Sequence, residues 1–121
     1  MALLVQKFGG TSVGTTERIE AVAEKVCRFR KEGHDVVVVV SAMSGETNRL
    51  IGLANDIMEE PTPREMDVLV STGEQVTIAL LSMALQKRGC DAVSRALTRT
   101  AASPPLVVAG PILLLLLSLR H

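Results

Sequence analysis

Apolar residues up to position 94 follow two alternating patterns. Residues 3–5 and 36–40 are aliphatic runs without polar interruption, which is typical of buried strands in a parallel sheet. Residues 16–31 instead carry apolar side chains at helical spacing, with a threonine at 15 or 16 as N-cap and Gly33 where the helix stops. Strands alternating with helices predict an α/β fold, an open and mainly parallel sheet sandwiched by helices.

Apolar residues at helical spacing also predict helices after residue 46 and after residue 64, and residues 90–93 are expected to begin a third strand. The stretch PTPRE (61–65) predicts a break between helices. STGE (71–74) predicts a second break, directly before a helix that ends near Gly89. This interpretation places Glu74 in the first turn of a helix.

The pattern changes after residue 94. Residues 95–121 contain no acidic residue, show no helix or strand period, and gather three prolines. A membrane anchor is one hypothesis, but the strongly apolar part begins only at Leu106 and is interrupted by Pro111, short of the roughly 20 residues that a span prefers. We therefore expect residues 1–94 to form an α/β domain and residues 95–121 to be an apolar tail that does not belong to the fold.

Composition excludes some partners. Lysine plus arginine and aspartate plus glutamate number 13 each, and tryptophan and tyrosine are absent, which argues against a nucleic-acid partner. Cys27 and Cys90 match no metal-ligand spacing, and no other metal-ligand cluster occurs, so no metal site is predicted. The two cysteines are expected to be reduced, structural thiols of a cytoplasmic protein.

The candidate chemistry starts with KFGGTS (7–12), which directly follows the first strand. Gly9 and Gly10 lack a Cβ, so their amides could approach phosphate oxygens, while Thr11 and Ser12 add hydroxyl donors and Lys7 adds a positive charge. The loop matches neither the Walker A pattern nor G-x-G-x-x-G. A tight glycine turn with a solvated lysine remains open as an alternative.

Two further motifs stand beside helices. SAMSGETN (41–48) follows the second strand and could bind a small anion at a helix N-terminus, or it could be an ordinary connection with Thr47 as N-cap. In STGE, Glu74 could hold a substrate ammonium group, or it could complement the helix dipole as a first-turn glutamate.

The three motifs in this order resemble the N-terminal part of bacterial aspartate kinases, over about residues 1–94 and including the connection at 63–67. The resemblance implies transfer of the ATP γ-phosphoryl group to the side-chain carboxylate of L-aspartate, the first step toward lysine, threonine and methionine, with Mg²⁺ as cofactor. It implies that Lys7 is catalytic and neutralises the transferring phosphoryl group, and that Ser41 lines the cleft between ATP and aspartate. It assigns the ATP phosphates to Lys7, Gly9, Gly10, Thr11, Ser12 and Ser41. It assigns aspartate to Ser41, Thr47 and Glu74.

The resemblance stops after Ser94. In the family, further residues bind the aspartate α-carboxylate, the nucleotide base and the metal, and regulatory domains that mediate oligomerisation follow; these are absent from this chain. The resemblance therefore implies that residues 1–94 are the N-terminal part of an incomplete kinase domain, and that residues 95–121 are a divergent apolar tail, frameshifted or not part of the fold. We expect this truncated fragment to be inactive by itself. Two alternatives stay open: another amino-acid kinase acting on a different carboxylate or on a carbamate, and a non-catalytic tail-anchored or interaction protein.

Overall fold

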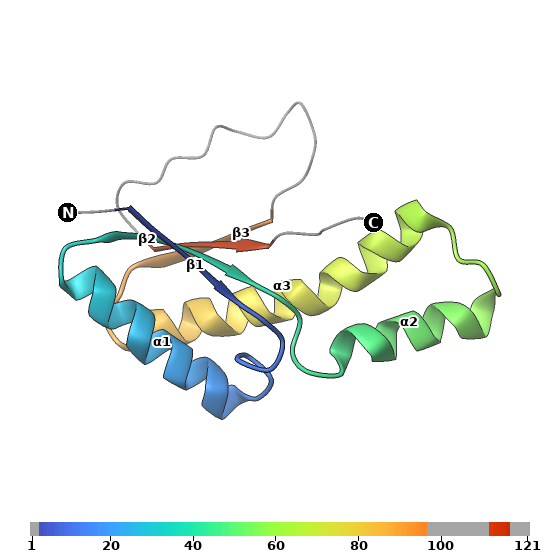
Figure 1. The fold of residues 1–121 in the computed structure, drawn as a ribbon, viewed down its shortest axis with the longest axis horizontal. Helices are drawn as coiled ribbons and strands as arrows, with labels where there is room; N and C mark the ends of the chain where they lie inside the picture. Colours follow the sequence, from blue (N-terminus) through green and yellow to red (C-terminus); the bar gives the residue numbers. More distant parts are fainter. Residues whose placement is uncertain (1–2, 97–111, 117–121) are drawn as a thin grey trace.

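The computed structural model describes residues 3–96 and 112–116, and four parallel strands form one sheet in the order β1-β2-β4-β3 (Figure 1). The elements in chain order are β1 (Leu3–Phe8), α1 (Thr16–Lys31), β2 (Asp35–Val40), α2 (Glu46–Ile57), α3 (Pro63–Lys87), β3 (Ala92–Ala96) and β4 (Ile112–Leu116). The predicted class, an incomplete α/β fold with an open parallel sheet, is confirmed.

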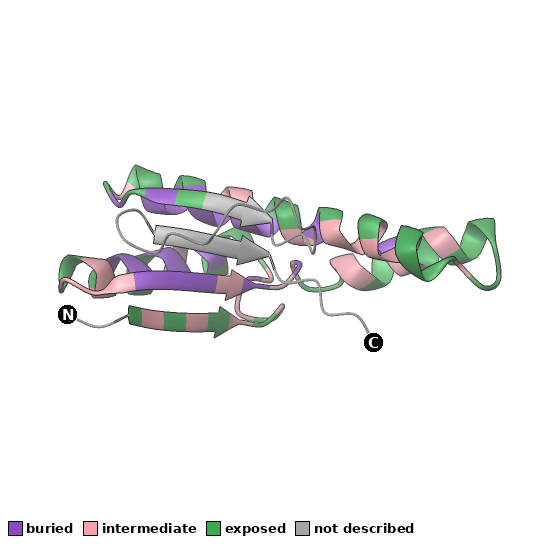
Figure 2. Ribbon diagram, turned by 90° about the horizontal axis from the view of Figure 1, so that it is seen from above, coloured by how far each residue is buried: buried purple, intermediate pink, exposed green. Residues whose placement is uncertain are grey.

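The valine run forms the buried strand β2, as predicted. Val36, Val38 and Val40 join one hydrophobic cluster with apolar residues of α1 and α3, so these two helices cover the same face of the sheet. Val37, which points to the second face, is also only 4% exposed. Figure 2 shows β2 as the buried centre of the described sheet.

β1 differs from its predicted character. It is an edge strand, and its side chains alternate between exposed and half-buried instead of being buried throughout (Figure 2). Phe8 packs against the core under α1, where the Lys25 ammonium lies 5.9 Å from its ring centroid. Leu3, Val5 and Lys7 therefore point to the second face, which no described helix covers.

The predicted boundaries of α1 are confirmed. The Thr15 hydroxyl accepts a hydrogen bond from the amide of Arg18, which satisfies one of the amides left free at a helix start. Arg28, Arg30 and Lys31 lie in the last turn, where cations complement the dipole, and Gly33 follows with a positive φ of 95°.

The predicted break at STGE is wrong. Residues 63–87 form one helix, α3, which begins with Pro63 in its first turn and carries 71–74 in its interior. By length and composition α3 could cross a membrane, a test that the core helix of a soluble protein also passes. In this fold α3 packs through a buried stripe: Gly73, Thr77, Ile78, Leu81, Ser82, Ala84 and Leu85.

The tail differs from expectation in part. Residues 112–116 were expected outside the fold, but they form β4, which pairs with both β2 and β3. A run of aliphatic residues with no charge is compatible with a central strand as well as with an apolar tail. Residues 97–111 and 117–121, which make up most of the predicted tail and of the hypothetical membrane anchor, lie outside the described residues.

The two cysteines also differ from expectation, because Cys27 and Cys90 form a disulfide with their Cα atoms 6.0 Å apart. Cys27 belongs to α1, and Cys90 follows Gly89 in the turn between α3 and β3. Their separation of 63 residues hid this proximity from any local spacing rule.

Candidate functional site

The first two motifs leave the sheet at the same edge. β1 and β2 are parallel with Phe8 opposite Val40, so the loop at 9–14 and the loop at 41–45 both begin at carboxyl ends of strands. The Ser41 amide donates a hydrogen bond to the Phe8 carbonyl oxygen at 3.3 Å. This edge is where open α/β sheets bind ligands.

Close packing of glycines joins these two loops. A Cβ added at Gly10 would lie 3.1 Å from the Ala42 carbonyl oxygen, and one added at Gly14 would lie 3.1 Å from the Ser44 Cβ. Neither position has a positive φ, so close approach and not turn geometry accounts for both glycines. A Cβ at Gly9 would meet nothing within 4 Å, so packing within the chain does not explain that glycine.

The remainder of the first loop is firmly anchored. The Ser12 amide donates to the Gly9 carbonyl oxygen at 3.0 Å and closes a turn, while Val13 is fully buried in the core. Thr11, which lies within that turn, is exposed, and Ser12 is partly buried. The loop therefore has one buried anchor and leaves the Thr11 hydroxyl accessible to a ligand.

The third motif reaches the same place through α3. A Cβ added at Gly73 would lie 3.2 Å from each of three atoms: Ala42 Cβ, Glu46 Cγ and Leu50 Cδ1. The missing side chain thus lets α3 lie against the second loop and against α2. Glu74 follows directly, so the structure brings all three motifs to one end of the sheet, where α2 and the first half of α3 extend beyond the strands (Figure 1).

Glu74 is the most perturbed carboxyl group at this end. Its Oε2 atom is buried and has no hydrogen-bond partner among the described residues. Burial raises the pKa of the Glu74 carboxyl from 4.5 to about 7. Because Glu74 lies in the helix interior, the alternative of a first-turn glutamate that complements the helix dipole is wrong.

Thr47 is not the N-cap that its local pattern suggested. Gly45 occupies that position with a φ of 81°, and Thr47 lies half-buried in the first turn of α2. Next to it, Glu46 receives a hydrogen bond from Arg49, which lowers the pKa of the Glu46 carboxyl. Thr47 is therefore released from capping and is available for another contact.

Lys7 lies on the second face of the sheet, opposite α1. It pairs in register with Val39, is exposed, and makes no ion pair or side-chain hydrogen bond within residues 3–96. The described side chains do not place Lys7 in contact with Thr47 or Glu74. They bring together the loops that carry these residues.

Sequence reasoning missed Gly14 and Gly73, the glycines that hold the three segments together. For Gly73 the available signal was a glycine inside a helical pattern, which is costly unless packing requires it. At Gly73 that signal was interpreted as a break in the helix. Among the described residues no group of three or more His, Cys, Asp or Glu side chains could hold a metal ion, so they provide no ligand set for Mg²⁺.

A parallel sheet with loops and helix starts gathered at its carboxyl edge defines an α/β ligand-binding domain. The chain belongs to the amino acid kinase family, which it matches over residues 2–107. It is 83% identical over 94 residues to an aspartokinase of Pseudomonas aeruginosa, covering 78% of this chain and 23% of that protein.

Solved structures agree with this assignment. An aspartate kinase from Synechocystis matches with a TM-score of 0.83 and 46% identity, over 93% of this chain and 21% of that chain. Aspartokinase III of E. coli in complex with aspartate and ADP has the same fold, with a TM-score of 0.70 at 19% identity over 96% of this chain and 40% of that one. The present chain thus spans about a quarter of the length of the curated relatives that it matches.

Proposed function

We propose that this chain is the N-terminal part of an aspartate kinase and supplies the phosphate loop and the amino-acid-binding side of the active site. The reaction converts ATP and L-aspartate to ADP and 4-phospho-L-aspartate in the cytoplasm, at the start of lysine, threonine and methionine biosynthesis. Its similarity to aspartokinases supports this assignment, as does the aspartate and ADP bound by one structural relative.

The proposal divides the site residues by chemistry. The ATP phosphates are held by Lys7, the amides of Gly9 and Gly10, and the hydroxyls of Thr11, Ser12 and Ser41. L-Aspartate is held by Ser41, Thr47 and Glu74. Phosphoryl transfer depends on positioning and on charge compensation. The acceptor carboxylate is ionised at neutral pH, so no residue is assigned as a general base. Mg²⁺ would compensate phosphate charge, but the described residues provide no ligand set for it.

The observation that carries the proposal is the buried, unpartnered Oε2 of Glu74. A carboxylate that has lost water and gained no hydrogen bond is unfavourable, which is why its pKa is raised to about 7. An α-ammonium group would provide the missing donors and the compensating charge. Binding of an amino acid at Glu74 is therefore expected to release a proton near neutral pH.

A titration of the 121-residue chain with L-aspartate, followed by NMR chemical shifts at pH 8, tests this assignment. Glu74→Gln is expected to weaken aspartate binding about tenfold or more, since it removes a charged hydrogen bond. Glu60→Gln, a matched change at an exposed glutamate between α2 and α3, should leave binding unchanged. Succinate, which lacks the ammonium group, should bind equally weakly to both variants.

Each outcome has a distinct meaning. Unchanged aspartate binding in Glu74→Gln would contradict the role of Glu74. Equal binding of L-glutamate and L-aspartate would favour another amino-acid kinase. We expect this chain alone to give no turnover above the blank in an ATP- and aspartate-dependent assay, and clear turnover would refute that expectation.

A further inference from the structure

The Cys27–Cys90 disulfide borders a surface hollow remote from the candidate site. The hollow has a volume of about 350 Å³ and is lined by Glu24, Cys27, Arg28, Lys31 and Arg88. Of the two cysteine residues, Cys27 lines the hollow and Cys90 does not. Both cysteine residues are otherwise buried, at 3% and 5% exposure.

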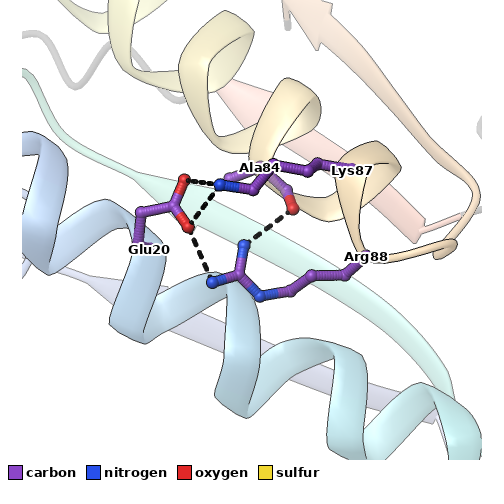
Figure 3. A network of polar contacts seen from close by, with 4 residues as sticks. All are labelled: Glu20, Ala84, Lys87 and Arg88. Carbon is purple, nitrogen blue, oxygen red and sulfur yellow. Dashed lines mark hydrogen bonds and ion pairs between the residues drawn. The ribbon is translucent and has the colours of Figure 1, made fainter.

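The hollow is mainly cationic. Arg28 and Lys31 are exposed and make no ion pair within the described part of the chain, and Glu24 is the single carboxylate of the lining. Arg88 is held in place, because its guanidinium donates to Glu20 at 2.7 Å and to the Ala84 carbonyl oxygen at 2.9 Å (Figure 3). Arg88 therefore borders the hollow as a fixed group, its charge shared with Glu20.

We propose that the Cys27–Cys90 disulfide is a reversible redox site that is opened by a small anionic thiol bound in this hollow. A nearby cation favours the thiolate form of such a thiol, which is its reactive form, and attracts its carboxylates. The hollow places its cations beside Cys27 and not beside Cys90, so the proposal assigns Cys27 as the residue that the thiol attacks.

The exchange has two steps. The incoming thiolate forms a bond to the Cys27 sulfur, and the bond between Cys27 and Cys90 breaks. Cys90 leaves as a thiolate and takes up a proton. A second molecule of the thiol then attacks the outer sulfur of the mixed disulfide, which frees the Cys27 thiol. Two thiols supply the two electrons and leave as their own disulfide.

Thiol counting on the oxidised full chain measures this reaction directly, because the chain has only two cysteines and the count rises from none to two. Glutathione, whose net charge is negative, should react about tenfold or more faster than cationic cysteamine when rates are compared per thiolate. Added salt should reduce the difference, since charges are screened over about 10 Å at 0.1 M ionic strength.

Charge-reversal variants test whether the cations of this hollow account for the faster reaction of glutathione. Arg28→Glu and Lys31→Glu should each slow the glutathione reaction severalfold. Lys25→Glu makes the same change on the same helix but outside this hollow, beside Phe8, and should leave the rate unchanged.

Three results would overturn the proposal. These are equal per-thiolate rates for glutathione and cysteamine, an equal slowing by Lys25→Glu, and two free thiols that persist after treatment with an oxidant. The comparison of the two thiols needs no variant, so it stands even if a substitution impairs folding.

Discussion

Replacing Gly73 by alanine tests the contact that brings α3 to the candidate site. The added methyl group would lie 3.2 Å from Ala42 Cβ, Glu46 Cγ and Leu50 Cδ1 at once. Ala42 and Leu50 are only 4% and 5% exposed, so neither has free space to move into. The Glu46 side chain is half-buried and can yield more easily.

Two opposing effects set the expected size of the change. Alanine in place of glycine inside a helix stabilises by about 1 kcal/mol. Forcing a methyl group into a packed contact costs about 1–3 kcal/mol. Because two of the three neighbours are buried, we expect the clash to exceed the gain, with a net loss of up to about 2 kcal/mol in the free energy of unfolding.

Gly52 provides the matched control. It lies in α2, is exposed, and a Cβ added there would meet nothing within 4 Å. Gly52→Ala should therefore stabilise by about 1 kcal/mol through helix propensity alone. The difference between the two variants isolates the cost of the contact at Gly73.

Urea unfolding followed by far-UV circular dichroism is the appropriate assay, because the chain has no tryptophan or tyrosine for fluorescence. With a slope of about 1–3 kcal/mol per molar urea, a loss of 2 kcal/mol lowers the midpoint by about 1 M. If Gly73→Ala were as stable as Gly52→Ala, α3 would not be held against the second loop in this way, and the convergence of the motifs would lose its structural basis.

Three further predictions concern stability. The raised pKa of Glu74 means that the folded chain holds this proton more tightly than the unfolded chain, so the free energy of unfolding should fall as pH rises from 4.5 to about 7, and Glu74→Gln should flatten this slope in urea titrations. Reducing the disulfide, which spans 63 residues, should lower the free energy of unfolding by about 4 kcal/mol, and a variant with both Cys27 and Cys90 changed to alanine should not respond to reductant. Leu81→Ala, at a fully buried position of α3, should cost about 2–5 kcal/mol, whereas Leu53→Ala, 48% exposed on α2, should cost under about 1 kcal/mol by the same assay.

Local sequence patterns correctly predicted those helices and strands whose surroundings in the fold match their local preference. The valine run of β2 and the threonine cap of α1 both formed as predicted, because an aliphatic run and a capping threonine are each recognisable within a few residues of the sequence. A break was wrongly predicted within α3, because a glycine such as Gly73 is typical of the end of a helix. Its real role is a contact with Ala42 and Leu50, which no local pattern contains.

The disulfide and the position of β4 in the sheet could not be predicted either, because both depend on contacts between residues far apart in the sequence. The Cys27–Cys90 disulfide joins residues 63 positions apart, and β4 enters the sheet between β2 and β3 out of chain order. The sequence shows the order of the three motifs along the chain. It does not show that they lie together in the fold, because that depends on the close approaches at Gly10, Gly14 and Gly73.

Because the second face of the sheet is not covered by a described helix, Lys7 is exposed to water, which weakens its interaction with a phosphoryl group. Leu3 and Val5 lie on that face at 56% and 65% exposure, and Lys7 follows them on the same side of β1. An exposed lysine acts through water, where a charge interaction at 4 Å is worth about 1 kcal/mol, against about 4 kcal/mol near a protein surface of lower dielectric. Covering the two apolar neighbours would therefore strengthen any interaction of Lys7 with a phosphoryl group, while the carboxyl group of Glu74, whose Oε2 atom is already buried, would change less. Our proposal accordingly expects amino-acid binding to be retained better than phosphoryl transfer when this chain is studied alone.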